Sequence, residues 1–233
     1  MSEYVRIKYA DWLRLMEAIN ATKKLADSIS PMTQDDIIIP PPAPEPELIR
    51  IPWGQYAIDK HGKEFMGGVL WIQAEIGLRA ELLTPCMYFE SKIDHKARNP
   101  YSSASGLIQF MSYTAENLGT SINYIRSLDA LGQLTWVYYY FKDFADRGYD
   151  LSQWDLADTY MAILWPAGIG KPMDHAIFTE GKGNAYAVNR GLDANKDGFV
   201  TKGEAARRVL QDAEDGLING RDCKYNPKTL TLA

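Results

Sequence analysis

A proline-rich segment near the N-terminus constrains the fold of this chain more than any other feature. Residues 39–52 contain six prolines, from Pro40 to Pro52. Because proline fixes φ and lacks a backbone donor, we expect this segment to be extended and stiff rather than helical. The sequence therefore predicts an N-terminal arm at residues 1–38, a proline-rich linker at residues 39–52 and a body at residues 53–233.

The arm has the pattern of an amphipathic helix. Apolar side chains recur at helical spacing over residues 5–30, among them Trp12, Leu15, Met16 and Ile19. One helix cannot form a core alone, so its apolar stripe needs a partner. The arm either folds back on the body, docks to another protein or a second copy, or stays unfolded, and the sequence leaves these alternatives open.

The body has the pattern of a mainly α-helical domain. Helical spacing of apolar residues recurs in five segments, at residues 65–76, 78–90, 107–118, 128–145 and 154–164. Gly77, Gly119 and Pro166 interrupt or end three of these segments. No convincing alternating strand of more than a few residues separates them, which favours a helical fold.

Composition excludes several kinds of partner. The net charge is −5, so a broad basic surface for nucleic acid is not expected. No window is apolar enough to span a bilayer, and the N-terminus lacks the basic and apolar regions of a secretory signal. We expect synthesis in the cytoplasm without a signal peptide, so another agent has to deliver the protein to any cell wall. For Cys86 and Cys223, free thiols are favoured over a disulfide.

Glu90 is a candidate catalytic acid. It follows the apolar run Met87-Tyr88-Phe89, beside which a carboxyl group would be partly desolvated. Desolvation raises the pKa of a carboxyl group, and a general acid near neutral pH needs such a pKa. A glutamate after an apolar run is, however, more often a surface charge on a helix, so the surrounding residues have to decide.

Short motifs surround Glu90 in a definite order. Gly77-Leu78 and Leu82-Leu83 precede it, and Ser91, Ala97, the run Ser102-Ser103-Ala104-Ser105-Gly106-Leu107-Ile108-Gln109, Thr114-Ala115 and Leu118-Gly119 follow. This order resembles the lytic transglycosylases of the goose-lysozyme-like superfamily, which show a Glu-Ser pair, a Gly-Ala-x-Gly-Leu-Met-Gln segment and a following Thr-Ala. The resemblance implies a lysozyme-like helical catalytic domain that acts on peptidoglycan.

The resemblance also implies a reaction for Glu90. The residue would protonate the glycosidic oxygen between N-acetylmuramic acid and N-acetylglucosamine. It would then accept the proton of the C6 hydroxyl, which closes on C1 and gives a 1,6-anhydro sugar without water. A second carboxylate would favour hydrolysis instead. Asp94 could share a helix face with Glu90, but goose-type lysozymes carry an aspartate where Ser102 and Ser103 stand here, which favours the transglycosylase reaction.

Five residues are candidates for substrate contact. Ser105 and Gln109 stand at a loop-to-helix junction, where polar groups can bind the N-acetyl groups of a sugar, or can instead cap the helix. The family's Ala-Tyr-Asn-Ala-Gly motif is poorly kept, with its nearest counterpart between Tyr160 and Gly168. Tyr160, Trp165 and Tyr186 are each candidates for the aromatic group near the acid, although each one alone also suits the core.

Residues 193–204 match the calcium-binding loop of an EF-hand. Oxygen ligands are expected from six of them, Asp193, Asn195, Asp197, Phe199, Thr201 and Glu204. Phe199 would use its carbonyl, and Gly198 permits the sharp turn. The alternative is a turn rich in Asx hydrogen bonds that keeps this geometry without the ion. Because the loop is single, a structural Ca²⁺ is favoured over a calcium switch.

The chain resembles phage transglycosylases, which commonly join a transglycosylase core to a calcium-loop segment, and the resemblance implies a phage-type enzyme that cleaves cell-wall glycan. An arm and a linker without an export signal suit a component of the virion, bound through the arm to tail or other particle proteins and acting in the periplasm or cell wall. An endolysin for host lysis, acting as a hydrolytic muramidase, is the close alternative. A non-catalytic virion protein that retains the fold is the alternative from another class.

Overall fold

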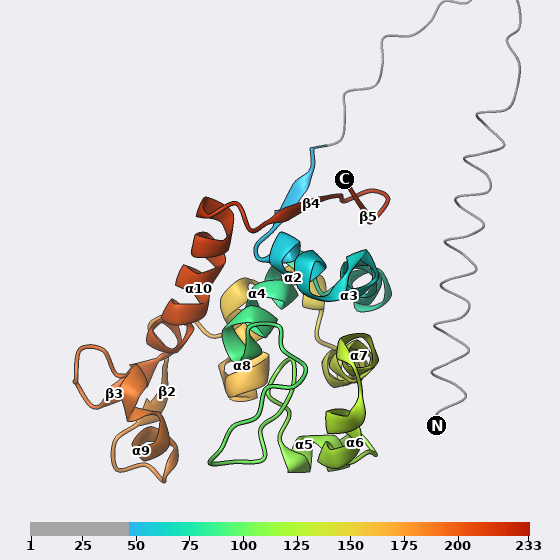
Figure 1. Ribbon diagram of the computed structural model, residues 1–233. Helices are drawn as coiled ribbons and strands as arrows, with labels where there is room; N and C mark the ends of the chain where they lie inside the picture. The colour runs from blue at the N-terminus through green and yellow to red at the C-terminus, as the bar shows by residue number, and fades with distance from the viewer. Residues whose placement is uncertain (1–46) are drawn as a thin grey trace, which may run out of the picture. The chain divides into compact units, whose positions relative to one another are not determined.

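Helices dominate the computed structural model, which describes residues 47–233 (Figure 1). The helices are α2 (Gly54–His61), α3 (Lys63–Ile76), α4 (Ala80–Ser91), α5 (Ser112–Asn117), α6 (Ile122–Ser127), α7 (Ala130–Asp146), α8 (Leu156–Leu164), α9 (Ala185–Asn189) and α10 (Lys202–Ile218). The prediction of a mainly helical body is confirmed. The predicted arm and the linker up to residue 46 lie outside the described residues.

The strands are short and form two small antiparallel sheets. One sheet has the order β1 (Ile49–Ile51), β4 (Cys223–Asn226) and β5 (Thr231–Leu232), and the other pairs β2 (Ala176–Thr179) with β3 (Phe199–Thr201). In the first sheet Ile49 lies opposite Tyr225 and Ile51 lies opposite Cys223. The last residues of the predicted linker therefore pair with the body, and Pro52 directly follows an edge strand, where a missing backbone donor is tolerated.

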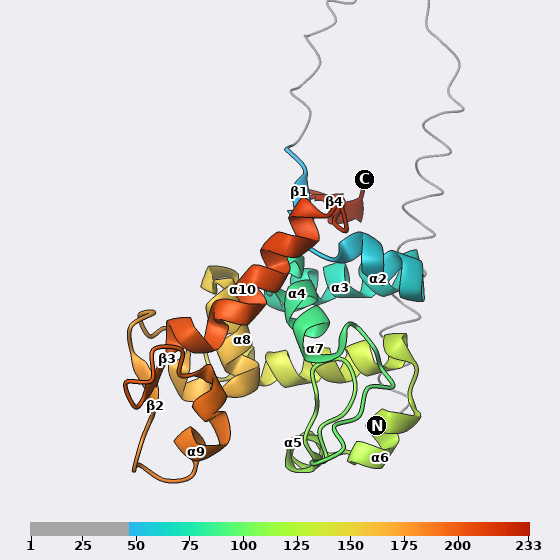
Figure 2. The same ribbon diagram turned by 60° about the vertical axis from the view of Figure 1, so that its left-hand side comes forward.

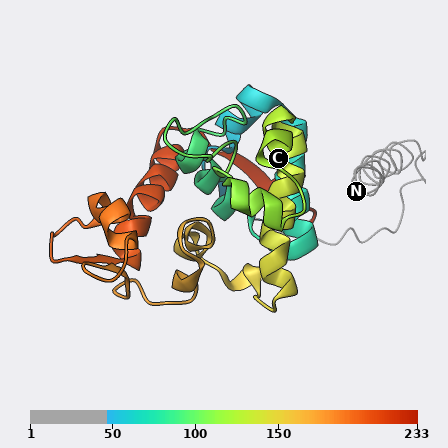
Figure 3. The ribbon, with the colours of Figure 1, turned by 90° about the horizontal axis from the view of Figure 1, so that it is seen from below.

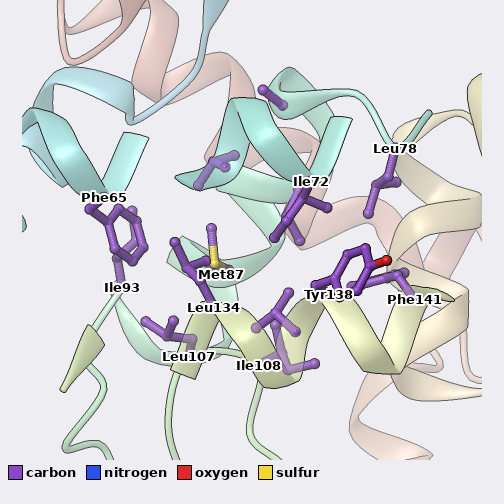
Figure 4. Packing of buried hydrophobic residues seen from close by; sticks show 14 of the residues in the cluster. Phe65, Ile72, Leu78, Met87, Ile93, Leu107, Ile108, Leu134, Tyr138 and Phe141 are labelled. Atoms are coloured by element: carbon purple, nitrogen blue, oxygen red, sulfur yellow. The ribbon is translucent and has the colours of Figure 1, made fainter. Parts of the chain in front are cut away.

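Two hydrophobic clusters hold the described residues together. The larger one fills the space between α3, α4, α7 and the loop after α4, as the labelled residues Phe65, Ile72, Met87, Leu107 and Leu134 show (Figure 4). The smaller one joins α4, α8, α10 and the β2–β3 sheet, and its members are Cys86, Ala157, Tyr160, Met161, Phe178, Val200, Ala205, Ala206 and Val209. α4 belongs to both clusters, so its position depends on the whole fold.

The helix predicted at residues 107–118 is wrong in its first part. Ser105 and Phe110 exchange two backbone hydrogen bonds of 3.0 and 2.8 Å, which close a tight turn, and α5 begins only at Ser112. Gly106 and Gln109 adopt φ of 76° and 53°, in the left-handed region that ends helices. The apolar residues of this turn face the core, which produces the spacing that resembles a helix.

The arrangement of helices gives α8 a central place. Seen from below, α8 lies between α7 on one side and the β2–α9–β3 segment on the other (Figure 3). In the turned view α10 runs alongside α4 and α8 (Figure 2). No helix within residues 47–233 has the length and apolar character needed to cross a membrane.

Candidate active site

Glu90 lies in the last turn of α4, where the helix leaves the core. The helix ends at Ser91, and Lys92 and Ile93 both adopt left-handed backbone conformations with φ of 54° and 51°. Two contacts hold this turn. Ile93 is fully buried, and the amide of Lys92 donates to Tyr88 O at 2.7 Å. The chain therefore bends sharply just beyond the acid, and Glu90 keeps part of its surface in contact with solvent.

The protein around Glu90 makes it a weak acid. Burial raises the pKa of its carboxyl group from 4.5 to about 7, and no neighbouring charge contributes to the shift. Within residues 47–233, the side chain of Glu90 takes part in no hydrogen bond or ion pair. A carboxyl group without a cationic partner and with a pKa near neutrality can hold a proton at pH 7 and release it to a substrate.

Two tyrosines and a cysteine stand near the Glu90 carboxyl group. Burial raises the pKa of Tyr160, and the nearby Glu90 adds to the effect. Burial likewise raises the pKa of Tyr140, to which Tyr113 and Glu90 contribute. Cys86 lies one turn before Glu90 on α4, fully buried, and its thiol pKa is raised well above 9.0 by burial and by Glu90. These uncharged groups keep the surroundings of the acid poorly hydrated.

Two contacts fix the tyrosines. The Tyr160 ring meets Phe89 edge-on, with 5.3 Å between centroids and an interplanar angle of 86°. The Tyr140 hydroxyl donates a 2.6 Å hydrogen bond to Ala162 O of α8. Of the three predicted aromatic candidates, Tyr160 is the one with an electrostatic interaction with Glu90. Tyr140 was not predicted, because it belongs to the aromatic run 136–141 of a helix whose spacing indicates only a core.

Ser91, the second member of the Glu-Ser pair, ties the end of α4 to the loop that follows. Its Oγ lies 2.9 Å from Leu107 O and 3.0 Å from Met87 O, and it accepts a 3.2 Å hydrogen bond from the Asp94 amide. A serine directly after the acid is therefore explained by geometry, since a small hydroxyl side chain can bridge the helix end and the loop. The Leu107 turn is thereby held close to Glu90.

Gln133 anchors the same loop from α7. It is fully buried, accepts from the Leu107 amide at 3.1 Å, and donates to His95 O at 2.9 Å and Ile125 O at 3.0 Å. A side chain on Gly106 would lie only 2.3 Å from Gln133 Oε1, so glycine is required there for this close approach as well as for its positive φ. The Gly106-Leu107 pair thus has a local structural cause.

The predicted sugar contacts Ser105 and Gln109 have different positions. Ser105 is fully buried, with its Oγ donating to Ser103 O at 2.8 Å and accepting from Arg126 Nε at 2.9 Å. This hydroxyl is therefore used inside the protein, where it joins the loop to α6. Gln109 is partly exposed and uses its amide nitrogen on Gly106 O at 3.1 Å. Gln109 remains the better candidate of the two for contact with a ligand.

Asp94, the alternative second carboxylate, lies beyond the helix end. Its Oδ1 accepts the Lys96 amide at 2.9 Å and so closes a turn. Because α4 has already ended at Ser91, a spacing of four residues does not place Asp94 on the helix face of Glu90. No carboxylate within the described residues contributes to the raised pKa of Glu90.

Trp165 and Tyr186 lie outside this cluster of contacts. Trp165, directly after α8, is 40% exposed and packs edge-on against Phe178 of β2, with 5.1 Å between centroids. The Tyr186 hydroxyl donates a 2.7 Å hydrogen bond to Asp193 Oδ2, at the start of the predicted calcium loop. Tyr186 is thus engaged at the loop.

The predicted calcium loop is closed by its own hydrogen bonds. Asp193 accepts the amides of Lys196 and Gly198 at 2.7 and 3.1 Å, and Gly198 has the positive φ, 85°, that the turn requires. Glu204, in the first turn of α10, forms a capping box with Thr201, and its Oε1 accepts the Ala194 amide at 3.1 Å. The hydrogen bond from Tyr186 is the largest cause that lowers the pKa of Asp193.

The oxygen atoms that residues 193–204 could offer to a metal ion are of the kind that a hard cation prefers, and they follow each other in the order of a calcium-binding loop. Asn195 and Asp197 bond to each other at 2.9 Å, and the Phe199 amide donates to Asp197 Oδ1 at 2.9 Å. The carboxylates thus point at loop amides, and within residues 47–233 no three His, Cys, Asp or Glu side chains converge as metal ligands. Binding of Ca²⁺ would require the side chains of Asp193, Asp197 and Glu204 to turn toward the ion, with the backbone path already formed.

Both cysteines are free, Cys86 in the smaller cluster and Cys223 at the start of β4.

The structure brings Glu90, Tyr160 and the Gly106–Gln109 turn into one region, held by Ser91 and Gln133. Comparison with known proteins adds no assignment, since no protein-family model matches the chain and no curated protein matches it either.

Proposed function

We propose that this protein is a peptidoglycan lytic transglycosylase with a lysozyme-like catalytic domain. One observation carries the proposal: Glu90 is a partly accessible carboxylic acid whose pKa burial raises to about 7. It stands at the helix end where the sequence resembles the catalytic segment of that family. The loop of the same segment is tied to the helix end through the Ser91 hydroxyl.

The reaction requires one group that acts first as an acid and then as a base. Protonated Glu90 donates its proton to the glycosidic oxygen as the bond between C1 of N-acetylmuramic acid and that oxygen breaks. The resulting carboxylate accepts the proton of the C6 hydroxyl while the C6 oxygen bonds to C1, so the proton count balances and water is not consumed. A pKa near the working pH suits both steps. The position of Asp94 in a turn supports a reaction without a second carboxylate.

The products of digestion test this proposal. We expect the purified protein to release muropeptides with 1,6-anhydro ends from purified sacculi, identified by mass spectrometry at a mass lower by one water than hydrolytic products. Products with reducing ends would identify a hydrolytic muramidase, the reaction of an endolysin-type alternative. Intact sacculi would favour a non-catalytic virion protein with a retained fold.

We further propose that residues 193–204 bind a structural Ca²⁺ through Asp193, Asn195, Asp197, Phe199, Thr201 and Glu204. The support is the order of hard oxygen donors along a loop that already has the required turn at Gly198. When bound, the ion would supply a fixed positive charge that holds the loop, without a part in the reaction. Its role would be to stabilise the β2–β3 sheet and the start of α10.

Calcium is expected to raise the melting temperature of the protein by about 5–10 °C relative to chelator at a concentration near 100 times the Kd, because the ion binds the folded state. Differential scanning calorimetry measures the shift. Asp197→Asn keeps the acceptor for the Phe199 amide but removes a ligand charge, so this variant should lose the calcium response and keep the melting temperature in chelator. An identical melting curve for the wild-type protein in both conditions would refute the calcium site.

The remaining proposals concern delivery. We propose that the arm, residues 1–38, attaches the enzyme to a carrier such as phage tail or other virion proteins, from which it acts on the periplasmic cell wall. The support is the sequence pattern of residues 1–52, in which an amphipathic stripe that needs a partner is followed by a proline-rich linker.

A further inference from the structure

Lys202 is a buried cation in the first turn of α10. Its side chain is only 3% exposed and forms a 2.5 Å ion pair with Asp158, which is 14% exposed. The ammonium group also donates to Lys171 O at 2.9 Å. Lysine is almost never buried unless paired, and a buried pair is costly to break, so this pair constrains whatever it joins.

The pair joins three segments that are distant in sequence. Asp158 lies in the first turn of α8, Lys202 begins α10, and Lys171 follows α8. Asp158 also accepts the Gly170 amide at 2.7 Å, so the chain after α8 is bound back to the beginning of the helix. The smaller hydrophobic cluster surrounds this junction with side chains of α8 and α10. The ion pair therefore sets how α8 sits against α10 (Figure 2).

α8 is also the helix that closes one side of the Glu90 surroundings. It carries Tyr160, which meets Phe89 edge-on, and Ala162, whose carbonyl accepts from Tyr140. These contacts attach α8 to α4 and α7, while the ion pair attaches it to α10. A shift of α8 at its beginning would move Tyr160, two residues after Asp158, away from Phe89.

We propose that Lys202 and Asp158 are positioning residues that hold α8, and with it Tyr160, against the catalytic acid, an inference that rests on the proposed function. The titratable groups facing Glu90 are Cys86 from α4, Tyr140 from α7 and Tyr160 from α8, and Arg208 of α10 acts on Tyr160. None of the three facing groups is charged at pH 7. Their effect on Glu90 is to exclude water, and this effect depends on close packing of α8.

The test removes the ion pair without leaving a buried charge. In the double variant Lys202→Met/Asp158→Leu both partners are apolar, a replacement that buried pairs often tolerate. We expect the titration midpoint of the Glu90 carboxyl group to fall by about one pH unit, because water enters the surroundings of the acid. The midpoint is measured by ¹³C NMR, and Glu90→Gln assigns the signal. From protonation alone, sacculus cleavage at pH 7 should then fall about fivefold.

An exposed pair of the same chemistry provides the control. Lys142 and Asp146 on α7 also form a 2.5 Å ion pair, but Asp146 is 61% exposed. Asp146→Asn should leave both the Glu90 midpoint and the cleavage rate unchanged. If the double variant does not fold, Lys202→Met/Asp158→Asn, which also leaves no buried charge and keeps an acceptor for the Gly170 amide, is measured in the same way.

A folded variant of the pair whose Glu90 midpoint equals that of the wild-type protein would overturn the positioning role. Because the NMR titration does not depend on activity, it separates the two proposals. A lowered midpoint in a protein that never cleaves sacculi would uphold the positioning role and reject the enzyme. Anhydro products from a pair variant whose Glu90 titration midpoint has not moved would uphold the enzyme and reject the positioning role.

Discussion

Replacing Glu90 with glutamine is expected to reduce glycan cleavage by about 10²–10⁴-fold while the fold is retained. Glutamine has nearly the same shape but can neither donate the proton to the leaving oxygen nor accept one from the C6 hydroxyl. The measurement is the rate of release of soluble muropeptides from sacculi. Glu116→Gln, an exposed glutamate on α5, is the matched control and should retain the wild-type rate.

The pH dependence of stability and cleavage, compared between the wild-type protein and Glu90→Gln, separates a catalytic role of Glu90 from a structural one. The pKa of Glu90 is raised in the folded state, so its contribution to stability is fully present below about pH 4.5 and is lost as pH rises through about 7. Glutamine suffers no such loss, so Glu90→Gln should melt higher than the wild-type protein at pH 8. Wild-type cleavage should fall as pH rises through about 7, because the acid must be protonated. Substantial cleavage by Glu90→Gln would reject the assignment.

Replacing Gln133 with leucine is expected to lower the free energy of unfolding by about 3 kcal/mol, because buried groups left without a partner cost about 1–3 kcal/mol each. Gln133 bonds to the Leu107 amide and to the carbonyls of His95 and Ile125. The Ile125 carbonyl keeps a second bond, from the Leu128 amide at 3.2 Å, so leucine leaves the Leu107 amide and the His95 carbonyl without this partner. Such a loss is a large share of the stability of a typical domain. Urea denaturation, followed by far-UV circular dichroism, measures it.

The control for Gln133 is Gln211→Leu on the exposed side of α10. Within residues 47–233 the Gln211 side chain bonds to Asp215 alone, at 3.1 Å on the surface, so its replacement should change stability by less than about 0.5 kcal/mol. Near-equal stabilities of the two leucine variants would contradict the view that Gln133 anchors the loop. We also expect Gln133→Leu to lose cleavage activity beyond its loss of folded protein, since the Leu107 turn lies at the helix end that carries Glu90.

Helices with a strong apolar stripe could be predicted well from the sequence, and the loop at 107–111 could not. In α3 and α7 the buried positions repeat at helical spacing, so local pattern and tertiary packing agree. In α4 the buried positions run continuously from Leu82 to Met87, because this helix is covered on several sides. In the turn, Leu107, Ile108 and Phe110 are buried because the chain folds over the core. The signal that could have prevented the error is Gly106, which precedes a tight turn here rather than a helix.

The candidate site shows the same division between local and long-range information. Glu90 could be chosen from its apolar flank and the motifs around it, because those residues are near in sequence. Tyr140 could not be chosen, because only tertiary packing of α7 on α8 brings its hydroxyl toward the acid. Burial of Ser105 was missed for a similar reason, since its partner Arg126 comes from a helix whose packing the sequence does not reveal.

The two left-handed residues after α4 determine the stage of folding at which Glu90 becomes buried. Lys92 and Ile93 are not glycines, and each left-handed residue of this kind costs about 1–2 kcal/mol. An isolated α4 would therefore not bend at this point, and the bend forms only when Ile93 is buried and the loop has closed. Before that step Glu90 is an ordinary solvated glutamate that is ionised at pH 7. Completion of folding is thus the step that buries Glu90 and raises its pKa, and partly folded chains lack a carboxyl group that holds a proton near pH 7.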